Sequence, residues 1–155
     1  MAAGPGMRVD YSEGIHIVSS TTDRSTLFQK IKLSTARWGV VATTFTSGGK
    51  EYAVFAGGST VSDIGTLSRA IDVFSMDGQW TLELSSTRME STAVSIGDTA
   101  LFGGGRYSGS TGSNNINDVY LSNGAPATNK TTNFTQRYHH AAAVAGDYAY
   151  FAGGD

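Results

Sequence analysis

Three stretches of this chain share one pattern of hydrophobic and polar positions, an apolar run that ends in a pair of glycines. The run AVFAGG at 53–58 returns as ALFGGG at 100–105 and as AYFAGG at 149–154. The phenylalanines stand at 55, 102 and 151, so the period is about 50 residues. Such a period is typical of a β-sheet unit that stacks on copies of itself. We therefore predict an all-β chain.

The segments around each glycine pair predict four short antiparallel strands per unit. A first strand of small and apolar residues is expected at 40–44, 91–95 and 141–145. A glycine-containing turn joins it to the run that ends in the glycine pair, which is the pattern of a β-hairpin. A third strand is expected at 70–74 and 117–120, and a fourth at 79–84. No segment has the periodicity of an amphipathic helix.

An arginine precedes each first strand, at Arg37, Arg88 and Arg137. The order of arginine, apolar hairpin, glycine pair, aromatic residue and tryptophan resembles the kelch repeat, one blade of a β-propeller. One unit holds the complete set, which is Arg37, Gly57, Gly58, Phe74 and Trp80. In the next unit Tyr120 takes the place of Phe74, but no tryptophan follows it. The chain lacks the Trp-Asp and Gly-His dipeptides of WD-type propellers.

The resemblance implies kelch-type blades of four antiparallel strands and a partial propeller of about three repeats. It implies one kelch-repeat domain over 1–155, with repeat segments at 26–83, 84–133 and 134–155 and an N-terminal half blade at 7–32. The glycine pairs would let neighbouring blades approach closely, and the aromatic residues would pack between blades. These structural positions are Gly57, Gly58, Gly104, Gly105, Gly153, Gly154, Phe74, Tyr120 and Trp80.

The ends of the chain fall within blades in this reading, which leaves apolar strand edges bare. A propeller needs about four to eight blades. Two explanations remain open. The chain is a fragment of a longer propeller, or two chains pair so that the C-terminal hairpin of one completes the N-terminal half blade of the other. We expect self-association through these edges.

Composition removes several classes of function. The net charge of −2 indicates no nucleic-acid partner. No apolar run approaches the ~20 residues of a membrane span, so no membrane partner is expected. The absence of cysteine excludes disulfides, zinc–thiolate sites and the Tyr–Cys copper cofactor of galactose-oxidase-like propellers. No signal peptide is evident, which leaves the compartment open and slightly favours the cytoplasm.

The remaining candidate chemistry is weak, and no cofactor, metal or catalytic residue is predicted. His139 and His140 would point to opposite faces of a strand, so they cannot share a metal ion without a bulge. The glycine clusters lack the residues and the helix of a phosphate-binding loop. Arg37, Arg88, Arg137, Glu90 and His139 could bind an anionic sugar, but they include no evident acid–base pair.

The predicted binding face is formed by the loops between blades. In kelch domains this face usually binds the partner, so the resemblance implies a non-catalytic, protein-binding segment that takes an acidic peptide. The alternative is a carbohydrate-binding or carbohydrate-active protein, similar to sialic acid mutarotases or oxidases. For the repeated arginines, a structural role as struts between blades is the competing interpretation. The candidate binding residues are Arg37, Trp38, Arg88, Met89, Arg106, Tyr107, Arg137, Tyr138 and His139.

Overall fold

The computed structural model describes residues 32–61, 66–107, 117–120 and 136–155 of the chain. The chain divides into two compact units, Met1–Ala36 and Arg37–Asp155. In the first unit only residues 32–36 are described, and they contain no strand. The predicted half blade at 7–32 lies outside the described residues, apart from its last position. Within the described ranges, no helix is long and apolar enough to cross a membrane.

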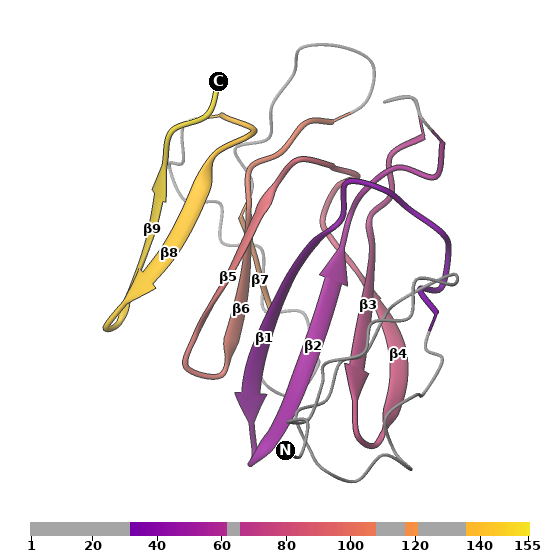
Figure 1. Cartoon of the computed structure of the whole chain (residues 1–155), viewed down its shortest axis with the longest axis vertical. Coiled ribbons are helices and arrows are strands. Elements are labelled where there is room, and N and C mark those ends of the chain that lie inside the picture. Colours follow the sequence, from indigo (N-terminus) through magenta and orange to yellow (C-terminus); the bar gives the residue numbers. More distant parts are fainter. Residues whose placement is uncertain (1–31, 62–65, 108–116, 121–135) are drawn as a thin grey trace, which may run out of the picture. The chain divides into compact units, whose positions relative to one another are not determined.

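The first sheet of the second unit has four antiparallel strands (Figure 1). They are β1 (Val41–Ser47), β2 (Lys50–Ala56), β3 (Ala70–Ser75) and β4 (Gly78–Glu83), hydrogen-bonded in the order β1-β2-β3-β4. Gly48 and Gly49 form the two-residue turn between β1 and β2, with φ of 55° and 76°. Positive φ at both turn positions matches the right-handed twist of the flanking strands, which is why glycine suits them.

The second and third sheets repeat the start of this order. The second contains β5 (Thr92–Ile96), β6 (Thr99–Gly103) and β7 (Asn117–Tyr120), and the third contains β8 (Ala141–Ala145) and β9 (Tyr148–Ala152). All neighbouring strands are antiparallel, which confirms the predicted all-β class. Any fourth strand of the second sheet would fall in 121–135, outside the described residues.

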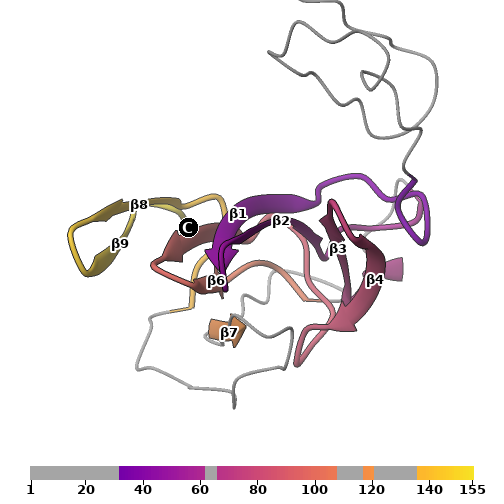
Figure 2. The same cartoon turned by 90° about the horizontal axis from the view of Figure 1, so that it is seen from below.

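The three sheets follow one another through their first strands. β1 lies beside β5, and β5 lies beside β8 (Figure 1; Figure 2 shows the sheets from below). The backbone joins them in the same way twice. Gly58 N donates to Arg88 O at 2.8 Å, and Gly105 N donates to Arg137 O at 3.0 Å. Thus the second glycine of the first two pairs bonds the arginine that opens the next unit.

The glycine pairs lie where the backbones approach most closely. A Cβ atom at Gly57 would lie 2.5 Å from Arg88 O, and one at Gly104 would lie 2.5 Å from Arg137 O. Real Cβ atoms essentially never come so near. Both glycines also have positive φ, 68° and 61°. Any other residue would therefore force the two sheets apart.

The hydrophobic core lies between the first and second sheets. Val54, Ala56 and Ile71 of the first sheet pack in one cluster with Ala100 and Phe102 of the second. At the edge of this contact the hydroxyls of Thr43 and Ser95 are 2.7 Å apart. Burying these side chains contributes most of the stability available to the pair of sheets, about 25 cal/mol per Å² of apolar surface.

The aromatic residues of the repeat lie on both faces of the first sheet, and of them Trp80 packs against this core. Phe74 is buried, and its ring meets the ring of Phe55 edge to face with centroids 5.7 Å apart. Trp80 is partly buried and packs against the core cluster. The backbone of Tyr120 is placed at the end of β7, while its side chain lies outside the description.

Candidate functional site

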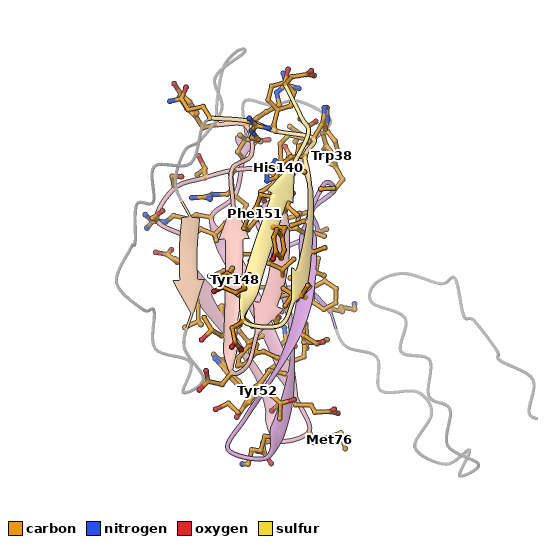
Figure 3. All side chains as sticks on the ribbon, turned by 90° about the vertical axis from the view of Figure 1, so that its left-hand side faces the viewer. Trp38, Tyr52, Met76, His140, Tyr148 and Phe151 are labelled. Carbon is orange, nitrogen blue, oxygen red and sulfur yellow. The ribbon has the colours of Figure 1, made fainter. Side chains whose placement is uncertain are left out.

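The candidate site is built on a backbone frame at one end of the sheets. In each unit the residue after the repeated arginine pairs with the residue after the glycine pair through two N–H···O bonds. These pairs are Trp38 with Ser59, Met89 with Arg106, and Tyr138 with Asp155, with N···O distances of 2.8–3.2 Å. In Figure 3 Trp38 lies at the opposite end of the sheets from Met76, which occupies the β3–β4 turn. The same frame therefore presents different side chains three times.

Four side chains on this frame contact one another, and we call them the Glu90 cluster: Glu90, Arg106, Tyr138 and His139. Arg106 Nη1 and His139 Nε2 lie 3.3 Å and 3.2 Å from Glu90 Oε2. The Arg106 guanidinium lies over the Tyr138 ring, 5.0 Å from its centroid, which is a cation–π contact. The cluster thus links the second unit to the third.

Glu90 and His139 hold an unusual backbone conformation. Their φ angles are 55° and 54°, and they are the only non-glycine residues with positive φ in the described part of the chain. Gly39 occupies the equivalent position of the first unit, two residues after its arginine, with φ of 65°. The frame therefore requires left-handed backbone here, and two units accept this strain while carrying a charged or titratable side chain. Strain of this kind is found preferentially at functional sites.

Two exposed aromatic residues lie on the same backbone frame or directly next to it. The side chains of Trp38 and Tyr107 are exposed, at 46% and 47%. Trp38 Nε1 donates to Val61 O at 2.5 Å, which holds the indole in one orientation. Tyr107 follows Arg106 directly. We call Trp38, Tyr107 and the Glu90 cluster together the loop face.

The repeated arginines lie beneath this face and bond inside the sheets. The side chain of Arg37 is fully buried and forms a 2.7 Å ion pair with Asp72 Oδ2 of β3. Arg88 is also fully buried, and its Nη1 donates to Gly104 O at 3.3 Å. These contacts are the ones expected of structural struts, and they leave Arg37 and Arg88 without surface to offer a partner.

Two further candidate binding residues, Met89 and Arg137, differ in how accessible their side chains are. Met89 is fully buried, so it contributes packing rather than a contact surface. Arg137 is more accessible, but its Nη1 donates to Gly153 O at 2.5 Å, the equivalent of the bond from Arg88 to Gly104. Of the nine residues predicted from the sequence, Trp38, Tyr107 and His139 are exposed and Arg106 and Tyr138 are partly exposed at this end of the sheets.

His140 lies beneath the frame, beside its exposed neighbour His139. The imidazole is buried against Phe151, with ring centroids 5.9 Å apart. Burial lowers the pKa of His140 from its usual value of 6.5, and the positive charge of Arg137 lowers this pKa further. His140 therefore favours the neutral form, which suits a packing position rather than a proton-transfer role.

The site has no features of a metal centre in the described part of the chain. There, no group of three or more histidine, cysteine, aspartate or glutamate side chains could hold a metal ion. What the arrangement offers is an arginine, a histidine and aromatic surface around one carboxylate. In comparisons with known proteins, no protein-family model and no curated protein matched the chain.

Two residues of this region were not predicted as site residues. Glu90 was considered only as one of several charged groups, because its position carries no repeated residue type. Asp72, the buried partner of Arg37, had a detectable signal: Asp118 stands at the equivalent place of the second unit, since Phe55 pairs with Asp72 and Phe102 pairs with Asp118. Aspartates repeated in phase with arginines indicate a structural ion pair.

Proposed function

We propose that this chain is a segment of a kelch-like β-propeller that binds another protein through its loop face and performs no catalysis. Successive antiparallel sheets, with four, three and two described strands and joined at glycine pairs, support the propeller interpretation. The interpretation also accounts for the arginines, each of which bonds within its own unit.

The binding role is supported by one observation: the backbone frame is the same in each unit, whereas the side chains on it differ. The backbone pairs recur in all three units, but the exposed side chains on them do not. A purely structural end of the sheets gives no reason to place an exposed tryptophan, an arginine on a tyrosine ring and a strained glutamate together. Large aromatic residues and arginine are the side chains most enriched at protein-binding hot spots.

The chemistry of the Glu90 cluster favours an acidic ligand. Arg106 and His139 both approach a single carboxylate oxygen of Glu90. Arginine alone carries five N–H donors, more than the roughly four acceptor sites of one carboxylate. A carboxylate of the partner would satisfy the surplus through charge-assisted hydrogen bonds. Aromatic or aliphatic groups beside that carboxylate would pack on Trp38 and Tyr107.

The test compares an acidic peptide with a neutral peptide of otherwise identical sequence. Fluorescence anisotropy of a labelled Glu/Asp-rich peptide, against the same peptide with Gln/Asn, should show binding of the acidic form only. Arg106→Ala should weaken this binding by tenfold or more, about 1.4 kcal/mol. Added salt should weaken it as well, because exposed charges are screened over about 10 Å at 0.1 M.

Lys50→Ala is the matched control, since Lys50 is an exposed cation at the β1–β2 turn, away from the loop face. It should bind as the parent does. Equal binding by the Arg106 and Lys50 variants would remove the loop face from the proposal.

A sugar ligand is the second candidate, and the fixed Trp38 ring favours it. An indole held by its Nε1–H exposes a flat apolar face, on which a pyranose ring can stack. N-acetylneuraminic acid carries both a ring and a carboxylate. Binding of this sugar with loss in Trp38→Ala, together with no binding of the acidic peptide, would favour the carbohydrate function over the protein-binding one.

A further inference from the structure

The two faces of each sheet can be told apart by register. Alternate residues of a strand point to opposite faces. We call face A the one that carries Val54 and Ala56 in the first sheet, and face B the one that carries Ala53 and Phe55. Phe55, Phe102 and Phe151 are equivalent, because each pairs with the second residue of the strand before it (Ala42, Ala93 and Ala142). The labels therefore extend to all three sheets.

Face B of the second sheet covers face A of the first. Ala100 and Phe102 of face B lie in the core cluster with Val54 and Ala56 of face A. The hydroxyl contact at 2.7 Å joins Thr43 of face A to Ser95 of face B. As a result, Val54 is only 3% exposed and Phe102 only 1%. Within the chain, the first sheet thus offers face A to the sheet that follows it.

Face A of the third sheet is exposed. Its residues are Ala141, Ala143, Ala145, Tyr148, Tyr150 and Ala152, and all six are exposed. Tyr148 and Tyr150 are 69% and 56% exposed, with ring centroids 6.4 Å apart. Figure 3 looks onto this side of the molecule and labels Tyr148. Tyr150 stands where the first sheet has the buried Val54.

The matching surface exists on the first sheet of the same chain. Its face B carries Ala42, Thr44, Ala53 and Phe55, the equivalents of Ala93, Ser95, Ala100 and Phe102. Ala42 and Thr44 are exposed, and Phe55 is partly exposed. We propose that face A of the third sheet packs on face B of the first sheet of a second copy of this chain. The contact repeats between two copies the packing that already joins the first and second sheets.

The chemistry of the two surfaces fits this occupant. The six residues of face A carry no charge, so apolar burial drives the contact. Alanines along β8 let the partner strand approach closely, and the two tyrosines supply large apolar area. The surfaces are different, so the contact is head-to-tail and either closes into a ring or extends into a chain of copies. It uses neither the loop face nor an acidic ligand, and salt should not weaken it.

The test uses the absence of cysteine from the chain. Thr43 and Ser95 touch inside the chain, and their equivalents across the proposed contact are Ala143 and Thr44 of the second copy. We therefore expect Ala143→Cys and Thr44→Cys chains, mixed and mildly oxidised, to form a disulfide-linked dimer. Neither variant alone should form this dimer through the contact. The cysteine at 143 would then face Thr44, and the cysteine at 44 would face Ala143.

A second set of variants separates association from cross-linking chemistry. Sedimentation velocity of the parent chain should show concentration-dependent association. Tyr150→Asp should abolish it while circular dichroism keeps the β-sheet spectrum, because Tyr150 is exposed. Met76→Asp is the control, since Met76 is fully exposed at the β3–β4 turn and lies on neither face. A parent chain that stays monomeric up to its solubility limit would overturn the proposal. The proposal would also be overturned if either cysteine variant alone formed as much disulfide-linked dimer as the mixture does.

Discussion

Individual side chains divide this repeat into a constant part and a variable part. Arg37, Arg88 and Arg137 bond within the sheets, whereas the residue that follows each of them is free to differ. The sequence could indicate the constant part because it recurs in phase. It could not decide whether those arginines are struts or ligands, because the repeat is equally consistent with both roles. Burial of Arg37 and Arg88 favours the strut.

The variable part was harder to predict. Trp38, Arg106 and Tyr107 could be proposed because they are large side chains outside the repeat, next to a repeated arginine or a glycine pair. Glu90 could not, because its importance depends on left-handed backbone and on contacts with residues 16 and 49 positions further along. The contact with Arg106 arises from chain pairing within the second unit, and the contact with His139 arises from the packing of two units, so local sequence indicates neither.

His140 gives a pH-dependent prediction. Burial and Arg137 hold its pKa below 6.5 in the folded chain, so the unfolded chain binds more protons just below this pH. The free energy of unfolding should therefore be highest above pH 6.5 and fall as pH drops toward the lowered pKa. His140→Ser, which copies Ser91 at the equivalent position of the second unit, should flatten this dependence.

The measurement is urea unfolding at pH 7 and at pH 5 for the parent and the variant. Other titrating groups are common to both chains, so the difference between the two pH dependences isolates His140. If the variant loses as much stability between these pH values as the parent does, His140 is not held neutral by the fold.

Strands and turns are the level at which the sequence was most informative. The alternation of apolar residues and the glycine turns predicted each described strand to within a few residues. The reason is physical: the strands are short, four hairpins have turns of two residues, and those turns fix the register of the hairpins locally. The fourth strand of the second unit had no tryptophan to mark it, and that segment lies outside the described residues.

The joint between successive sheets gives a prediction about glycine. Gly104 and Gly97 have similar φ, 61° and 55°, but only Gly104 faces backbone, with Arg137 O 2.5 Å from the place of a Cβ atom. Gly97→Ala should cost roughly 1–2 kcal/mol for left-handed backbone alone. Gly104→Ala should cost about 1–3 kcal/mol more, because the second and third sheets must separate. Urea midpoints report both, and equal midpoints would mean that the sheets do not meet at Gly104.

For the molecule as a whole we infer one rule of packing: face B of a sheet covers face A of the preceding sheet, as the second sheet covers the first. The sequence predicted that units must stack, because a sheet with two apolar faces cannot stand alone in water. It could not supply the number of units in a complete assembly, because the stacking rule can be repeated for any number of units. The same rule brings the Glu90 cluster together, because Glu90 and Arg106 belong to the second unit and Tyr138 and His139 to the third.

The most direct test of this rule is a cysteine pair between the second and third sheets. Thr43 and Ser95 touch between the first and second sheets, and their equivalents one unit later are Val94 and Val144. Thr43→Cys/Ser95→Cys serves as the positive control for disulfide formation. The account predicts that Val94→Cys/Val144→Cys also forms an intramolecular disulfide, seen by mass spectrometry of the oxidised monomer, without loss of the β-sheet spectrum. Formation of the control disulfide alone would contradict it, because the sheets would then not follow one repeated packing.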